Sequence, residues 1–95
     1  MAITVSVRYH NALRHRTGLA LETVELAPGT NLAAMLAHLA EAHGSTLGEM
    51  LLGLDGEVAP HLVVFRNGRL IYRDQRDELL ADGDELLLFP AISGG

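Results

Sequence analysis

Two segments that are apolar at every position constrain the fold of this chain more than any other feature. Leu62–Phe65 reads Leu-Val-Val-Phe, and Leu86–Phe89 reads Leu-Leu-Leu-Phe. Both predict β-strands, but neither alternates apolar and polar residues as a strand with water on one face does. Either loops and a short second helix cover the second face of these strands, or that face is an exposed apolar patch that docks a partner protein.

Two hairpins are predicted from turn signals and alternation. Ile3–Tyr9 alternates apolar and polar residues, and the alternation returns at Val24–Leu26, so these segments predict an N-terminal hairpin joined by a short loop. Asn67-Gly68 is a strong signal for a second hairpin, because both central residues of a type I′ turn need positive φ. Leu70–Tyr72 is then the expected partner strand of Leu62–Phe65.

One main helix is predicted between the two hairpins. Thr30 is the expected N-cap, and Gly44 stands where a helix commonly ends. A second, short helix is predicted over Leu47–Leu51. The apolar stripe of the main helix falls at helical spacing and consists of Leu32, Met35, Leu36 and Leu39.

The predicted order of elements is strand, strand, helix, strand, strand, strand, with Glu85–Phe89 as the last strand. Pro90 lacks an amide hydrogen and is expected to end the ladder. The strands must form one sheet with the helix across one face, which is an α+β architecture. We expect a single domain over residues 1–90, followed by a flexible tail over residues 91–95.

Composition excludes several classes of function. With 95 residues the chain has one thin core and little material for a catalytic cavity of its own. It has no cysteine and no lysine, which excludes disulfides, thiolate nucleophiles and Schiff-base chemistry. Seven basic residues against twelve acidic ones argue against nucleic-acid binding. With no signal peptide or membrane-spanning run, we expect a cytoplasmic protein. We also expect that it is not an enzyme and that it is a monomer when free.

Clusters of titratable residues do not predict a metal site. His38 and His43 are five residues apart, which puts them about 140° apart around a helix rather than on one face. Six acidic residues lie between Asp74 and Glu85, but without the spacing of a calcium-binding loop. We interpret them as a solvated loop that can steer a basic partner, and we expect no metal, no bound cofactor and no catalytic residue.

The end of the chain, Ser93-Gly94-Gly95, is its most informative motif. Chance and a cloning remnant are the alternatives to a function. Glycine has no Cβ and accepts almost any backbone angle, so this tail could thread a narrow channel in another protein. Its terminal carboxylate is inert at neutral pH unless it is activated, for example by ATP as an acyl adenylate in a partner's site.

Three motifs together resemble the ubiquitin-like sulfur carriers of the MoaD/ThiS family. They are Val64-Phe65-Arg66-Asn67-Gly68, the turn Leu79-Leu80-Ala81-Asp82-Gly83-Asp84-Glu85, and the ending Phe89-Pro90-Ala91-Ile92-Ser93-Gly94-Gly95. The element order matches along the whole chain, and the specific motifs occupy about the last third. The resemblance implies a β-grasp fold with a mixed five-stranded sheet.

The resemblance also implies a role for the tail. A ubiquitin-activating-type enzyme would use ATP to adenylate Gly95, and sulfur from a persulfide donor would convert it to a thiocarboxylate. Gly94, Ser93 and Ile92 would form the threading segment. The implied partners are the adenylating enzyme and a sulfur-accepting synthase subunit.

A partner-binding patch follows from the same resemblance. Phe89 and Leu87 would face the partner, and Val64 and Leu70 are further candidates for the patch. Leu86 and Leu88 would point into the core.

Three functions remain open at this point: a sulfur carrier, a ubiquitin-like modifier joined through Gly95 to lysines of other proteins, and an interaction module with a passive tail. The acceptor of the sulfur is also open, among cysteine, molybdopterin and other sulfur-containing metabolites. Small subunits of molybdopterin synthase usually have two prolines before the tail, whereas this chain has Pro90-Ala91. That departure is more like carriers that serve cysteine synthesis or another dedicated pathway.

Overall fold

The structure is a computed structural model that describes residues 2–10, 12–44, 48, 50–52, 61–72 and 75–90. The described segments form the following elements: β1 (Ile3–Tyr9), α1 (Ala12–Thr17), β2 (Leu21–Leu26), α2 (Leu32–His43), β3 (Leu62–Arg66), β4 (Arg69–Ile71) and β5 (Glu85–Pro90).

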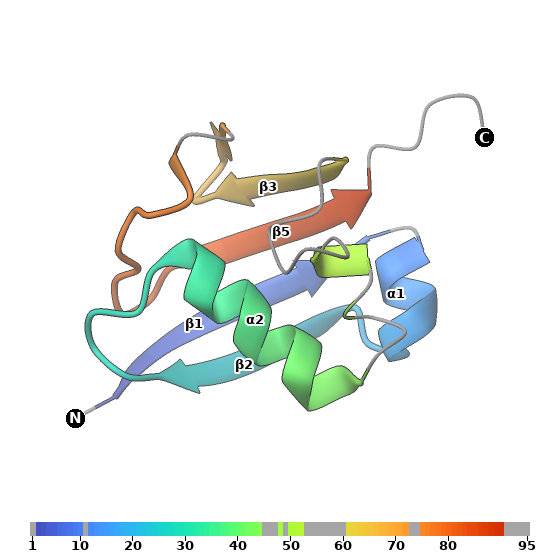
Figure 1. The fold of residues 1–95 in the computed structure, drawn as a ribbon, viewed down its shortest axis with the longest axis horizontal. Coiled ribbons are helices and arrows are strands. Elements are labelled where there is room, and N and C mark those ends of the chain that lie inside the picture. Colours follow the sequence, from blue (N-terminus) through green and yellow to red (C-terminus); the bar gives the residue numbers. More distant parts are fainter. Residues whose placement is uncertain are drawn as a thin grey trace.

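The sheet has five strands in the order β2-β1-β5-β3-β4. The two central strands, β1 and β5, run parallel, with Tyr9 beside Leu88, and the other neighbouring strands are antiparallel. Helix α2 lies across one face of this sheet (Figure 1). The arrangement confirms the α+β architecture and the mixed β-grasp sheet with one main helix.

The core lies between α2 and the inner face of the sheet, which is the face that α2 covers. The four predicted stripe residues of α2 are at most 2% exposed. Leu86 and Leu88 of β5 are buried against them, which confirms their predicted direction. Leu51 also joins the core, and Gly48, Met50 and Leu51 are helical, whereas Leu47 of the predicted second helix lies outside the described residues.

The connection between β1 and β2 differs from the predicted short loop. The two strands pair antiparallel as expected, but the six-residue helix α1 lies between them. Leu13 is the side chain that anchors this helix, because it is fully buried while Arg14 and His15 are exposed. A helix of six residues is too short to show the apolar periodicity from which a helix is predicted.

Helix α2 begins one residue later than predicted, because its N-cap is Asn31 rather than Thr30. Asn31 has extended backbone angles, and its Oδ1 accepts a hydrogen bond of 2.8 Å from the backbone N–H of Ala34. The Thr30 hydroxyl instead donates to the carbonyl of Ala27 at 2.6 Å, which holds the preceding turn. At the other end Gly44 adopts a φ of 92°, as predicted for the residue that ends the helix.

The β3–β4 turn has the predicted conformation and an additional role. Asn67 and Gly68 have φ values of 52° and 82°, the positive angles that a type I′ turn needs. The Asn67 side chain also donates to Asp84 Oδ1 at 3.0 Å and accepts from the backbone N–H of Glu85 at 2.9 Å. The turn therefore holds the beginning of β5 in register with β3.

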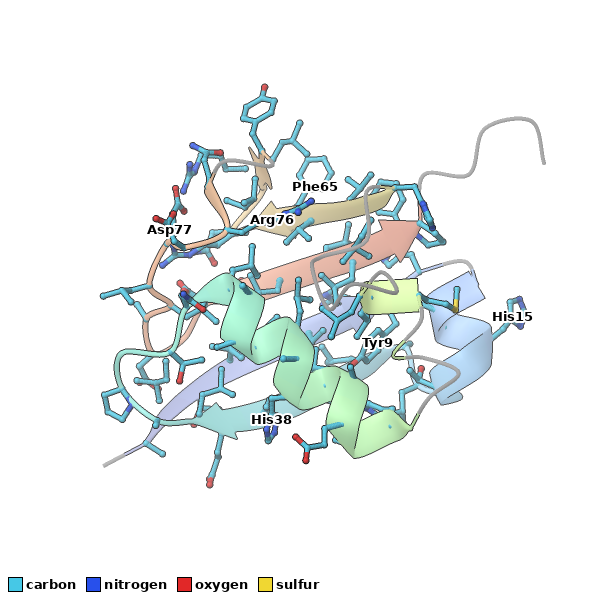
Figure 2. The ribbon with its side chains drawn as sticks, viewed as in Figure 1. Tyr9, His15, His38, Phe65, Arg76 and Asp77 are labelled. Carbon is cyan, nitrogen blue, oxygen red and sulfur yellow. The ribbon has the colours of Figure 1, made fainter. Side chains whose placement is uncertain are left out.

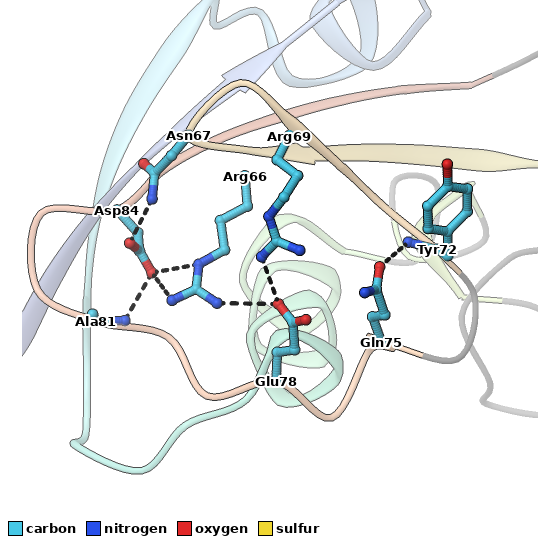
Figure 3. Close-up of polar contacts among 8 residues, drawn as sticks. All are labelled: Arg66, Asn67, Arg69, Tyr72, Gln75, Glu78, Ala81 and Asp84. Atoms are coloured by element: carbon cyan, nitrogen blue, oxygen red, sulfur yellow. Dashed lines mark hydrogen bonds and ion pairs between the residues drawn. The ribbon is translucent and has the colours of Figure 1, made fainter.

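Asp84 is the buried acidic residue that organises this corner of the sheet (Figure 3). Its Oδ2 lies 2.8 Å from Nη2 of Arg66 and accepts a hydrogen bond of 2.8 Å from the backbone N–H of Ala81. Burial raises the pKa of Asp84, but the hydrogen bonds from Ala81, Asn67 and Arg66 and the charge of Arg66 outweigh it, so the pKa lies below its ordinary value.

The segment of residues 75–84 is also tied to the N-terminus of α2. The carbonyls of Glu78 and Arg76 accept hydrogen bonds of 3.1 Å from the backbone N–H groups of Leu32 and Ala33. These two donors have no partner within the helix, so the acidic segment satisfies them. The predicted solvated loop is therefore a structural strap between the hairpin and the helix.

Candidate partner-binding surface

The outer face of the sheet, opposite α2, carries apolar side chains on its β5, β3 and β4 strands. On β5, Leu87 and Phe89 are partly exposed, and they alternate with the buried residues Leu86, Leu88 and Pro90. The strand is apolar on both faces because one face builds the core and the other remains accessible. Among the described residues this second face is partly exposed, and its role in binding a partner stays a prediction.

Strand pairing brings aromatic rings together on this face. Phe65 of β3 lies opposite Leu87, and Val63 lies opposite Phe89. The rings of Phe65 and Phe89 occupy diagonal positions and stack, with centroids 6.2 Å apart and an angle of 15° between their planes. This geometry is favourable for aromatic pairs.

One predicted patch residue faces the other way. Val64 is 4% exposed and belongs to the core, because the alternation of β3 puts Val63 and Phe65 on the outer face. Leu70 of β4 does lie on the outer face, opposite Phe65, and is 37% exposed. Val63 and Phe65 were missed because a strand that is apolar throughout gives no sign of which positions face outward. We define the outer apolar surface as Val63, Phe65, Leu70, Leu87 and Phe89.

A hollow of about 370 Å³ lies at one end of this surface. Phe65 and Leu87 give it apolar walls, while Arg8 and Glu85 are charged groups at its border. The remaining lining residues are Asn67, Gly68 and Leu86. A pocket with apolar walls and a polar rim fits an anchoring side chain of a protein partner.

The surface leads directly into the tail of the chain. Phe89 precedes Pro90, the last residue of β5, and the sequence continues with residues 91–95. The predicted tail residues Ile92, Ser93, Gly94 and Gly95 lie outside the described residues, so their roles stay predictions. Five extended residues span at most about 18 Å, which limits how far from this surface a partner could act on Gly95.

Other kinds of site have little support in the described part of the chain. No group of three or more histidine, aspartate or glutamate side chains there could hold a metal ion. Likewise, none of the described helices is long and apolar enough to cross a membrane.

Comparison with known proteins gives a consistent result. The sequence profile of the ThiS family matches residues 7–95. A putative sulfur carrier protein of Archaeoglobus fulgidus is 34% identical over 62 residues, which cover 64% of this chain and 69% of that protein. Small archaeal modifier protein 3 of Haloferax volcanii is 45% identical over 42 residues. The match covers 43% of this chain and 46%, or about half, of that modifier.

A solved structure matches along nearly the whole chain. The crystal structure of SAMP1 from Haloferax volcanii superposes with a TM-score of 0.80 and 30% sequence identity, covering 97% of this chain and 99% of that one. This likeness confirms the fold that the element order and strand pairing define.

Proposed function

Because the chain belongs to the ThiS family, whose profile covers residues 7–95, we propose that it is a sulfur carrier protein that acts through a C-terminal thiocarboxylate on Gly95. The proposal is supported by the relative named as a putative sulfur carrier. In this function the chain is a protein co-substrate, and its partners supply the catalytic groups.

The proposed chemistry has two stages. The Gly95 carboxylate attacks the α-phosphorus of ATP in the activating enzyme, which forms the acyl adenylate and releases pyrophosphate. A persulfide sulfur then displaces AMP, and a thiol reduces the resulting acyl disulfide to leave the thiocarboxylate. The thiocarboxylate sulfur then bonds to an acceptor held by a synthase subunit, and water hydrolyses the bond between that sulfur and the Gly95 carbonyl, which leaves the sulfur on the acceptor and regenerates the carboxylate.

The observation that carries the proposal is the continuity between the outer apolar surface and the tail. Leu87 and Phe89 present accessible apolar area on the strand that ends at Pro90. A partner that binds this surface therefore also receives the residues that follow. Burying a few such side chains contributes only a few kcal/mol, which suits a carrier that must leave one partner for another.

Intact-mass measurement tests the proposal directly. The protein is incubated with its activating enzyme, ATP and a sulfur source, and a variant lacking Gly95 serves as the control. We expect the mass change of an oxygen-to-sulfur exchange, located at the C-terminus by fragmentation, in the full chain only. The proposal would be contradicted if the mass of the full chain did not change under conditions in which the same enzyme converts another carrier to its thiocarboxylate.

Protein modification is the second candidate, because some relatives are named small archaeal modifier proteins. In that function the activated Gly95 forms an isopeptide bond with a lysine of another protein. The chain itself contains no lysine, so it cannot form lysine-linked polymers with its own copies. Peptide mapping of lysates for adducts linked through Gly95 tests this candidate, and a lack of adducts in cells that express the protein would exclude it.

The choice of acceptor is a third question. We propose a dedicated sulfur-transfer pathway, such as one that makes cysteine, with the small subunit of molybdopterin synthase as the alternative. Purification of the thiocarboxylate form and incubation with candidate synthase subunits would separate these, since only the true acceptor returns the chain to its carboxylate mass.

A further inference from the structure

Charge is distributed unevenly along this chain. Residues 1–21 hold three of the seven arginines and none of the twelve acidic residues. Every acidic residue therefore belongs to the part that begins at Glu22. The whole chain has a formal net charge of −5. The N-terminal fifth is therefore a basic segment within an acidic protein.

The fold places the last part of this basic segment beside the end of β5, the strand that ends at Pro90. Strands β1 and β5 are parallel, so β1 leads into α1 at the same end of the sheet at which β5 ends in Pro90 (Figure 1). The backbone N–H of His10 donates to the carbonyl of Leu88 at 3.0 Å, which ties the entry to α1 to the last part of β5. His15 projects from α1 away from the sheet (Figure 2).

Four side chains at this end are exposed, and we call them the basic end: Arg8, His10, Arg14 and His15. No ion pair among the described residues involves Arg8 or Arg14. In contrast, Arg66 and Arg69 both contact Glu78, and Arg66 also contacts Asp84. Among the described residues, therefore, Arg66 and Arg69 at the hairpin are ion-paired, whereas Arg8 and Arg14 are not.

The basic end also adjoins the outer apolar surface. Arg8 lies opposite Leu87 in the β1–β5 ladder and borders the hollow that Phe65 and Leu87 line. A protein that covers the apolar surface and takes up the tail would therefore meet Arg8 and the exposed side of α1 at the edge of the same contact.

We propose that the basic end binds an acidic surface of the activating protein, beside the channel that receives the tail. The inference rests on the proposed function, because it assigns the partner of that same surface. An acidic partner repels most of this acidic chain and attracts only the end from which the tail emerges. Such a charge distribution orients the encounter and presents Gly95 first, with an effect that salt should weaken.

Two variants and one matched control test the proposal with the full chain and its activating enzyme. Arg14→Gln and His15→Glu each remove or oppose positive charge on α1. His38→Glu changes an exposed histidine of α2 in the same way, away from the end of β5 (Figure 2). ATP–pyrophosphate exchange gives KM and kcat for the carrier at low and high salt, and calorimetry gives the Kd of the complex.

We expect Arg14→Gln and His15→Glu to raise KM and Kd about two- to fivefold at low salt, with kcat unchanged and with less difference at high salt. His38→Glu should stay near the wild-type values.

Equal KM, Kd and salt dependence for all four proteins would overturn the inference. In that case, exchange by the wild type would still uphold the proposed function. If the wild type binds but shows no exchange, the proposed function fails and the Kd values alone decide the role of the basic end. RNA retained by the wild type but not by Arg14→Gln, with unchanged Kd for the enzyme, would also overturn it.

Discussion

The hydroxyl of Tyr9 donates a hydrogen bond of 2.6 Å to Glu22 Oε2 across the β1–β2 pair. The same oxygen lies 2.7 Å from Nε2 of His43, the last residue of α2, and the rings of Tyr9 and His43 meet edge to face. Tyr9 is 1% exposed. This contact therefore joins two strands and the end of the main helix through one carboxylate.

Tyr9→Phe removes the hydroxyl and keeps the ring. We expect the free energy of unfolding to fall by about 1–2 kcal/mol, because Glu22 loses a partly buried hydrogen bond while the packing of the ring remains. Urea unfolding at neutral pH measures the change. A loss well above 3 kcal/mol would mean that the ring has moved, and near-ultraviolet circular dichroism would detect such a movement.

We also predict that the stability contributed by Tyr9 depends on pH. Burial, the hydrogen bond to Glu22 and the negative charge of Glu22 together hold the pKa of Tyr9 well above its ordinary value. The folded state thus favours the neutral phenol, so this stabilisation is complete below about pH 10, the ordinary tyrosine pKa, and is lost as the pH rises above it. We expect the stability difference between wild type and Tyr9→Phe to shrink above that pH, and a constant difference would contradict this explanation.

Asp84→Asn is expected to lower the free energy of unfolding more than Tyr9→Phe does. It leaves the guanidinium of Arg66 partly buried without its closest counter-charge, which costs about 3–5 kcal/mol for a buried pair. Arg69→Gln is the control, because the Arg69–Glu78 pair is more exposed and should contribute less than about 1 kcal/mol. Urea unfolding at neutral pH compares the two variants.

Low pH should remove the stabilisation of the folded state that Asp84 provides. Because its folded-state pKa is lowered, the stabilisation is present above the unfolded-state value of about 3.9 and is lost as the pH falls through the folded-state value. The difference between wild type and Asp84→Asn should therefore narrow in acid. A difference that widens in acid would contradict the assignment of a lowered pKa.

Leu87→Asp tests the outer apolar surface. A charge beside Phe65 and the hollow should raise the KM of the adenylation step by about tenfold or more, because interface anchors contribute on the order of 1–2 kcal/mol or more. Leu79→Asp is the matched control, since Leu79 lies beside Asn31 at the N-terminus of α2, outside both the outer apolar surface and the basic end, and is 61% exposed. Thermal melting should show that both variants fold, and equal KM values would exclude this surface from the interface.

The hairpin turn gives a purely conformational prediction. Gly68 has a φ of +82°, and a Cβ placed there would meet nothing within 4 Å. Gly68→Ala should therefore lower the free energy of unfolding by about 1 kcal/mol through backbone strain alone. Asn67→Gly keeps a turn-compatible backbone but removes the side-chain bonds to Asp84 and Glu85, so a comparable loss in that variant would show that the side chain matters as well as the turn.

Much of the fold was predictable because local chemistry decides it. The alternation of β1, the stripe of α2 and the Asn67-Gly68 turn each depend on residues that are close in sequence. Helix α1 was not predictable, since Leu13 is the only buried side chain among those described in this six-residue helix. The N-cap was misplaced by one residue because Thr30 and Asn31 are both good capping residues, and only the backbone path selects between them.

The candidate site was predictable only in part. The uninterrupted apolar sequence of β5 indicated either a covered second face or an exposed patch, and Leu87 and Phe89 are partly exposed on that face. The direction of Val64 depended on the pairing of β3 with β5, which a strand that is apolar throughout cannot specify. The roles of the Gly-Gly tail were predicted from the resemblance to a family, and those residues lie outside the described part of the chain.

Periodicity and backbone angles are properties of neighbouring residues, so the strands, the main helix and the β3–β4 turn follow from local sequence. The tertiary fold sets which side of the apolar strands faces outward, which cation pairs with Asp84, and that the acid-free N-terminal segment reaches the end of β5. Those relationships join residues far apart in the chain, and the parallel pairing of β1 with β5 creates the last of them.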